Sequence, residues 1–105
     1  MAVRNRLHQV VRLGHFAEGL KWAQELDQLC RSKGLQPTRF WSPFVGEVNH
    51  LILESEYPDL AAFEAETNRF QSDPEVMKLF RKGADHIEEG EIPWTEMEVE
   101  APELA

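Results

Sequence analysis

Apolar and polar residues alternate along the first segment of the chain, from Val3 to Leu13. This period of two is typical of a β-strand with one apolar and one polar face. From Phe16 to Cys30 the apolar residues recur every three or four positions, which predicts an amphipathic helix. Gly34 then stands where a glycine often ends a helix in a left-handed conformation. We therefore expect the chain to begin with a strand followed by a helix.

Two further strands are predicted at Thr38–Val45 and Val48–Tyr57, because both segments are rich in β-branched and aromatic residues. Gly46 and Glu47 between them indicate a short hairpin. Pro43 has no backbone N–H to donate to a neighbouring strand, so the first of these strands is expected at an edge of the sheet.

A helical period returns over Leu60–Gln71 and again over Glu75–Glu89. At the break, Ser72 and Glu75 have the spacing of a capping box, and the proline between them suits a first helical turn. Alternation over Ile92–Val99 predicts a last strand.

This order of elements defines an α+β fold of the ferredoxin-like type, β-α-β-β-α-β. Right-handed crossovers place the first and third strands at the centre of a four-stranded antiparallel sheet, with the helices on one face. A chain of 105 residues is long enough to bury one such core. We assign residues 1–100 to this single domain and residues 101–105 to an acidic tail.

The net charge of −8 is concentrated at the carboxyl end, where seven acidic residues and no basic ones follow position 87. These are Glu88, Glu89, Glu91, Glu96, Glu98, Glu100 and Glu103. Nucleic acids and anionic membranes both bind basic surfaces, so we expect no nucleic acid and no membrane as a partner.

The hydropathy of the chain favours a cytoplasmic location. No apolar run approaches the roughly 20 residues that span a bilayer, and the amino end lacks the apolar stretch of a signal peptide. Cys30 is the only cysteine, which excludes an internal disulfide and a metal site with several thiolates. It lies on the apolar stripe of its helix, where we expect it to act as a small hydrophobic residue.

The predicted sheet has two unlike faces. The face expected under the helices carries Leu7, Val11, Leu13, Leu51, Leu53, Met97 and Val99. The other carries Arg4, Arg6, His8, Arg12, His50, Ile52, Glu54, Glu56, Trp94, Glu96 and Glu98. Opposite charges on neighbouring strands stabilise such a face, which is either open to water or covered by a second sheet. A set of apolar positions favours the second arrangement: Val10, Val48, Ile52, Ile92 and Trp94.

The segments VNHLILESEY (48–57), LAAF (60–63) and FQSDPE (70–75) resemble the dimeric α/β-barrel superfamily of small ferredoxin-like proteins. The nearest resemblance is to its antibiotic-biosynthesis-monooxygenase-like and NIPSNAP-like groups, which commonly carry a Ser-Asp-Pro break in the second helix. The order of strands and helices resembles that of these groups over nearly the whole chain. It implies a homodimer in which two sheets pack face to face, and a pocket between sheet and helices in each subunit.

Haem degradation is one activity of this superfamily, and the sequence disfavours it. The resemblance places Asn5 where haem-degrading relatives carry a pocket asparagine. Those relatives also carry a tryptophan just before the break and a histidine ligand about two turns after it. Here the corresponding residues are Phe70 and Leu79-Phe80, and His86 lies further along. We therefore expect no cofactor.

Asn5, Gln9 and Asn49 are the polar residues that we expect to converge on a pocket. Trp41, near Phe40 and Phe44, lines an aromatic-binding pocket or covers a helix or dimer edge. Both alternatives remain open for Trp41.

His8 and His50 lie on the same predicted face of adjacent strands, and Trp94 shares that face. If they converge with Glu54, two imidazoles and a carboxylate offer metal binding or acid–base chemistry. A structural role in a polar interface is favoured, so no metal site is assigned, and His8, His50 and Trp94 are kept as candidate ligand-binding residues. The other two histidines, His15 and His86, are expected at the surface.

The leading hypothesis is a homodimeric protein that binds a small apolar or aromatic ligand between sheet and helices. Cofactor-independent monooxygenase-like and isomerase-like enzymes fall within it, and whether the protein is an enzyme stays open. The alternative is a non-catalytic structural or interaction domain without a ligand pocket. An apolar cavity with a few convergent polar groups favours the first hypothesis, and a filled core favours the second.

Overall fold

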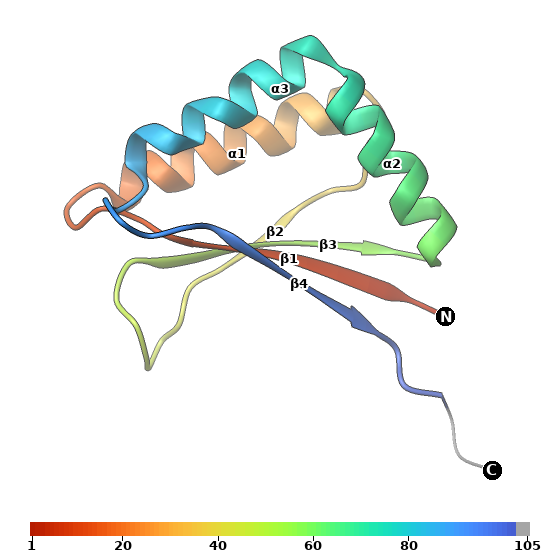
Figure 1. Cartoon of the computed structure of the whole chain (residues 1–105), viewed down its shortest axis with the longest axis horizontal. Coiled ribbons are helices and arrows are strands. Elements are labelled where there is room, and N and C mark those ends of the chain that lie inside the picture. Colours follow the sequence, from red (N-terminus) through yellow and green to blue (C-terminus); the bar gives the residue numbers. More distant parts are fainter. Residues whose placement is uncertain (103–105) are drawn as a thin grey trace.

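The computed structural model describes residues 1–102 of the chain. A four-stranded sheet carries its helices on one face (Figure 1). The elements are β1 (Val3–Val10), α1 (Phe16–Ser32), β2 (Arg39–Trp41), β3 (His50–Tyr57), α2 (Leu60–Ser72), α3 (Pro74–Arg81), the 3-10 helix η1 (Lys82–His86) and β4 (Trp94–Val99). Residues 103–105 of the predicted acidic tail lie outside the described residues. Within residues 1–102, no helix has both the length and the apolar character to cross a membrane.

The strands lie in the order β2-β3-β1-β4, and all neighbouring strands are antiparallel. This confirms the predicted α+β, ferredoxin-like fold with β1 and β3 at the centre. The register places Asn5 opposite Ser55 on one side and opposite Met97 on the other. Because side chains alternate across a sheet, the odd-numbered residues of β1 face the helices and the even-numbered ones face away.

The helices begin and end at short polar signals in the sequence. Asp59 accepts a hydrogen bond from the backbone N–H of Ala62 at 2.7 Å, which caps α2. Gly34, with φ of +80°, lets the chain turn away from the end of α1, as predicted. At the break between α2 and α3, however, Asp73 is the cap and accepts from the N–H groups of Glu75 and Val76. The expected capping box of Ser72 is therefore wrong.

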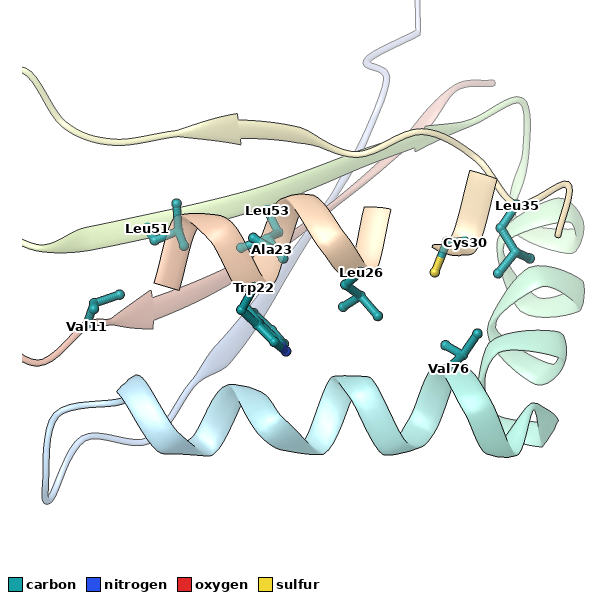
Figure 2. Packing of buried hydrophobic residues seen from close by; sticks show 9 residues of the cluster. All are labelled: Val11, Trp22, Ala23, Leu26, Cys30, Leu35, Leu51, Leu53 and Val76. Carbon is teal, nitrogen blue, oxygen red and sulfur yellow. The ribbon is translucent and has the colours of Figure 1, made fainter. Parts of the chain in front are cut away.

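The core lies between α1, the helix-facing side of β3 and the start of α3 (Figure 2). Its buried members are Val11, Trp22, Ala23, Leu26, Cys30, Leu35, Leu51, Leu53 and Val76. Each large apolar side chain buried here contributes about 1.5–3 kcal/mol to the free energy of unfolding. The indole Nε1 of Trp22 donates to the backbone carbonyl of Leu79 at 2.7 Å, which ties α1 to α3.

All four strands are shorter than the sequence pattern indicates, and β3 and β4 each begin two residues later than predicted, at His50 and Trp94. β1 ends at Val10, and Leu13 is 75% exposed in the turn that follows, so its predicted place under the helices is wrong. β2 covers only Arg39–Trp41 of the expected Thr38–Val45. A loop over 42–49 replaces the expected short hairpin, because Pro43 cannot donate to the sheet and Asn49 adopts a φ of +64°.

Candidate functional site

A cavity of about 550 Å³ lies between the sheet and the helices. Its floor is the helix-facing side of β1, β3 and β4, and its walls come from α1, α2 and α3. No residue of α2 is buried, because its inner face borders this cavity through Phe63, Thr67 and Phe70. The cavity is therefore lined largely by apolar side chains, and α2 contributes its inner face to the lining.

Three polar side chains of the central strands lie on the cavity floor. Asn5 and Ser55 are cross-strand neighbours, and Tyr57 follows on the same face of β3. The Ser55 hydroxyl lies 3.3 Å from that of Thr38. The Asn5 amide makes no side-chain hydrogen bond within residues 1–102. Polar atoms of Asn5 are thus available to a molecule in the cavity.

Two acidic residues also line the cavity. Asp27 accepts from the backbone N–H of Thr38 at 2.8 Å and from Nε of Arg31 at 2.9 Å. Glu66 accepts from the backbone N–H of Gln36 at 2.9 Å. Both carboxylates are therefore fixed in position by the chain itself.

The environment keeps two other groups of the lining protonated. Burial raises the pKa of the Tyr57 phenol, and the negative charge of Glu66 raises it further. Burial, with a smaller contribution from Asp27, raises the pKa of the Cys30 thiol to about 11. At neutral pH the cavity therefore contains a phenol, which lies beside Glu66, and a thiol.

Of the three polar residues expected at a pocket, only Asn5 lines the cavity. Gln9 is buried beyond it, where Oε1 lies 3.4 Å from Nε2 of His86. Asn49 lies in the loop before β3, and its carbonyl accepts from the N–H of Val11 at 2.8 Å. The lining contains no histidine, so the described residues offer no imidazole ligand to a haem iron in this cavity.

His86 is buried beside α1, which corrects its expected place at the surface. Its ring centroid lies 4.9 Å from that of Trp22. Burial lowers the pKa of His86, an effect that the charges of Asp85 and Glu18 oppose. A change from α-helix to 3-10 helix at Lys82 turns this histidine inward.

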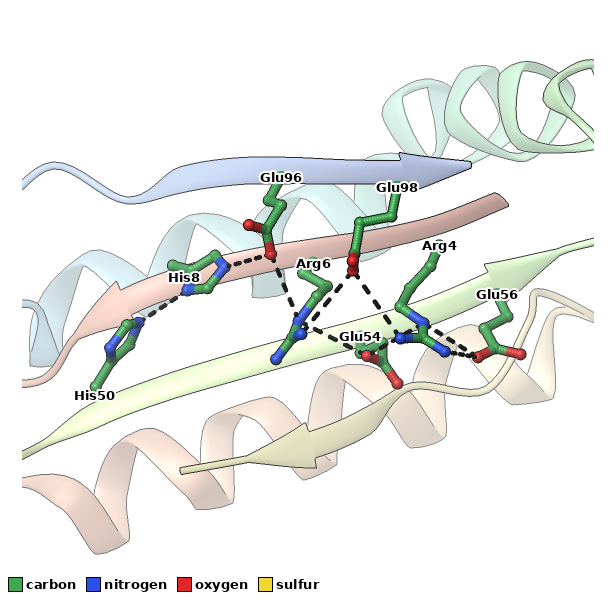
Figure 3. A network of polar contacts seen from close by, with 8 residues as sticks. All are labelled: Arg4, Arg6, His8, His50, Glu54, Glu56, Glu96 and Glu98. Carbon is green, nitrogen blue, oxygen red and sulfur yellow. Dashed lines mark hydrogen bonds and ion pairs between the residues drawn. The ribbon is translucent and has the colours of Figure 1, made fainter. Parts of the chain in front are cut away.

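The structure brings together His8, His50 and Trp94 on the far face of the sheet (Figure 3 shows the two histidines). Nδ1 of His8 lies 2.9 Å from Nε2 of His50, and the His8 ring stacks on Trp94 with centroids 3.7 Å apart. The carboxylate nearest to His8 is that of Glu96, at 3.3 Å. Glu54 instead pairs with two arginines, so the constellation of two histidines and Glu54 does not assemble. No group of three or more potential metal ligands is present among residues 1–102.

The arginines of β1 join the glutamates of both neighbouring strands (Figure 3). Arg4 lies 3.1 Å from Glu56 and 3.5 Å from Glu54, whose side chain is only 3% exposed. Arg6 lies 3.7 Å from Glu54 and 3.8 Å from Glu96. Nε of Arg6 is buried but has no hydrogen-bond partner within residues 1–102. This face is a charge network with one unsatisfied donor at its centre.

Trp41 lies apart from the cavity. Its ring is 42% exposed and lies under the guanidinium of Arg39, whose Cζ is 4.9 Å from the ring centroid. Phe44 is fully exposed in the loop after β2, whereas Phe40 packs against the core. The three aromatic residues therefore do not form a common pocket.

Sequence reasoning missed Ser55, Tyr57 and Glu66 as cavity residues. Ser55 and Tyr57 continue the odd-numbered face of β3 that begins with Leu51 and Leu53, and this parity was a usable signal. Glu66 carries no comparable signal, because a glutamate within an amphipathic helix usually faces water.

The layer arrangement and the cavity between the layers define a small ferredoxin-like α+β domain. The profile of the NIPSNAP family matches residues 7–95, so the chain belongs to the NIPSNAP family. A NIPSNAP domain protein from Burkholderia xenovorans superposes with a TM-score of 0.76 at 22% identity, covering 96% of this chain and 95% of that one. A NIPSNAP family protein from Agrobacterium tumefaciens gives 0.77 at 14%, covering 96% and 94%.

A solved antibiotic biosynthesis monooxygenase is also similar, with a TM-score of 0.71 at 14% identity over 95% of this chain and 99% of that one. These findings confirm the resemblance to both groups. At such identities the likeness to solved structures establishes the fold alone. Among curated proteins, the comparison found no match.

Proposed function

We propose that the protein is a homodimer that binds a small, predominantly apolar molecule in the cavity between sheet and helices. The observation that carries this proposal is a cavity of about 550 Å³ with Asn5, Ser55 and Tyr57 on its floor. Ligand pockets typically have about 300–1,000 Å³, an apolar lining and a few well-placed polar groups. The cavity has all three properties.

The polar groups of the floor support binding of a ligand with at least one polar atom. A partly buried amide without a partner is costly unless a hydrogen bond is supplied. Asn5 offers a donor and an acceptor there, and Tyr57 offers a phenolic donor. A ligand with a hydroxyl or carbonyl group between them satisfies these atoms.

The far face of the sheet supports the homodimer. Its central strand carries Arg4 and Arg6, and both flanking strands carry glutamates, so a twofold-related copy presents a complementary charge pattern. The unpartnered Nε of Arg6 gains an acceptor when a second sheet covers it. Trp94, which is 51% exposed, adds apolar area to the same face.

An enzymatic role of the monooxygenase-like or isomerase-like kind requires a group that transfers a proton to or from the ligand. The raised pKa of Tyr57 suits its phenol to hydrogen bonding with a ligand and not to proton transfer near neutral pH, which leaves Glu66 as the carboxylate of the lining that takes part in no ion pair within residues 1–102. A solved structure with this fold is described as an antibiotic biosynthesis monooxygenase, which makes cofactor-independent oxygenation the first reaction to assay.

Binding in the cavity is tested by filling it. Thr67→Trp places an indole on the cavity side of α2, whereas Glu64→Trp adds the same ring on an exposed position of that helix. The affinity for Nile red, a neutral apolar fluorophore, is expected to fall about tenfold or more in Thr67→Trp and to stay unchanged in Glu64→Trp. Equal affinities in the two variants contradict the proposal and favour a structural domain without a ligand.

Native mass spectrometry of the gently purified protein tests the natural ligand and the assembly together. We expect a dimer mass that includes a small molecule in stoichiometric amount. A monomer mass at micromolar concentration contradicts the proposed assembly.

A further inference from the structure

We infer that the ligand of this cavity is an apolar molecule that carries a protonated amine, with Glu66 as the residue that selects for the positive charge. This inference rests on the proposed function and narrows its ligand class. The charged side chains that line the cavity are all of one sign.

The cavity lining contains two carboxylates, Asp27 and Glu66, and no lysine, arginine or histidine. A desolvated anion gains stability from a nearby cation and loses it beside another anion. A ligand with a carboxylate or phosphate would therefore enter a cavity in which no described side chain offsets its charge. A positive group meets an opposite charge in the same place.

The two carboxylates differ in what already surrounds them. Asp27 forms an ion pair with Arg31, with Nε and Oδ2 2.9 Å apart, and also accepts from Thr38. Glu66 takes part in no ion pair within residues 1–102. It accepts from the backbone N–H of Gln36, at 2.9 Å to Oε1, and interacts with the phenol of Tyr57, so both of these partners are uncharged. The negative charge available to a ligand is therefore that of Glu66.

Aromatic rings beside Glu66 provide a second contact of the kind that cations favour. Tyr57 and Phe63 meet edge to face with ring centroids 5.2 Å apart, and both line the cavity. Phe63 and Phe70 lie three residues before and four residues after Glu66, which places them on the same side of α2. An ammonium group near an aromatic face and a carboxylate is bound by both, and desolvation strengthens the attraction.

The apolar remainder of the cavity accommodates the body of such a ligand. Leu7 and Leu53 lie on its floor, while Met77 and Phe80 come from α3. Because methionine is flexible, this part adapts to the shape of a ring system. The polar and apolar lining together fit a polycyclic or branched amine.

The inference is tested with three fluorescent probes that share one ring system and differ in charge. They are 9-(aminomethyl)anthracene, 9-anthracenemethanol and 9-anthracenecarboxylic acid, titrated at pH 7 into the full-length protein. We expect the amine to bind about tenfold or more tightly than the alcohol, and the acid to bind most weakly. In Glu66→Gln the preference of the amine over the alcohol is expected to disappear.

Glu64→Gln is the matched control, since it removes the same charge from an exposed position of α2. It should leave the order of the three probes unchanged. If the probes bind but the acid equals the amine, or if Glu66→Gln keeps the preference for the amine, the inference is overturned while the cavity remains a binding site. If Thr67→Trp does not weaken any of the three, the proposed function fails and the inference fails with it.

Discussion

The indole of Trp22 lies so close to Gly83 that a Cβ atom at residue 83 would be 2.5 Å from Cζ2 of the ring. Such a distance is far inside van der Waals contact, and the ring cannot turn away easily because Nε1 is hydrogen bonded to the carbonyl of Leu79. The absence of a side chain at residue 83 therefore allows η1 to pack against α1.

Gly83→Ala is expected to lower the free energy of unfolding by about 1–3 kcal/mol, because the added methyl group overpacks a buried contact. Urea unfolding followed by circular dichroism measures the change. In the double variant with Trp22→Phe, the smaller ring relieves the clash, so the two changes should be less than additive. Additive effects would show that the contact between residues 22 and 83 does not limit the packing.

The buried His86 makes stability depend on pH in a defined direction. Burial lowers its pKa in the folded state, so between that pKa and the unfolded value of 6.5 the unfolded chain binds more protons. The contribution of His86 to the free energy of unfolding should thus be complete above about pH 6.5 and decrease as the pH falls below this value. Urea unfolding at pH 7.5, 6.5 and 5.5 measures this slope.

His86→Gln keeps a polar side chain near Gln9 without a titrating group. The variant should lose part of the slope between pH 6.5 and 5.5. His15→Gln is the control, because His15 is a half-exposed histidine at the start of α1. A slope in His86→Gln equal to that of the wild type would mean that other groups cause the pH dependence.

The strand order and the two sheet faces could be predicted because alternation is a local property that burial imposes on each strand. The role of Gly34 at the end of α1 could likewise be predicted, since a helix end depends on residues close in sequence. His86 was placed wrongly because the helical period was extended through Lys82, where the chain changes to 3-10 geometry. Gly83, in the 3-10 segment, packs against Trp22, which is distant in sequence, so no local pattern indicates this packing.

The candidate site could be predicted only in part. Asn5 was identified through the family resemblance, but the cavity itself depends on how far α2 stands from the sheet, which no local pattern encodes. The contact of His8 with His50 required the register of β1 against β3, which pairs His8 with Ile52 and Val10 with His50. Register is set by long-range packing and was not readable from the strands alone.

Cys30 is expected to react slowly with thiol reagents in the folded protein. Its pKa of about 11, against 9.0 for a free thiol, lowers the fraction of thiolate about 100-fold at pH 8, and burial restricts access further. The rate of alkylation by iodoacetamide at pH 8, measured by mass spectrometry, should rise by at least this factor in denaturant. A rate in the folded protein close to the denatured one would show that the thiol is exposed.

Because Cys30 lines the cavity, a bound ligand should slow this reaction further. The alkylation rate of Cys30 is measured with and without a saturating amount of the tightest-binding anthracene probe. The same pair of measurements is made on Thr67→Trp, in which the cavity is filled. Protection in the wild type and not in the variant would support binding beside Cys30. Equal rates with and without probe would place the bound molecule elsewhere.

Substitution of Arg6 tests whether the charged face of the sheet forms the dimer interface. Arg6→Glu adds a carboxylate to a face that already holds Glu54, Glu96 and Glu98, and it removes a cation that lies 3.7 Å from the buried Glu54. If two such faces meet in a homodimer, like charges then oppose each other within each sheet and across the interface. The variant is expected to be monomeric at micromolar concentration in sedimentation velocity, whereas the wild type is dimeric.

Arg81→Glu makes the same change of net charge at the end of α3, in the helix layer on the opposite side of the sheet, where Arg81 is exposed and forms no ion pair within residues 1–102. This control variant should remain dimeric, which would show that the position of the new charge, and not the change of net charge, disrupts the dimer in Arg6→Glu.

Arg6→Gln removes the cation without adding an anion, so it preserves more of the fold and should weaken the dimer less. Since the helix-facing core does not include Arg6, circular dichroism should still show a folded chain in Arg6→Gln. A wild type that is monomeric, or an Arg6→Glu variant that is folded and dimeric, would mean that copies of this protein do not meet through this face.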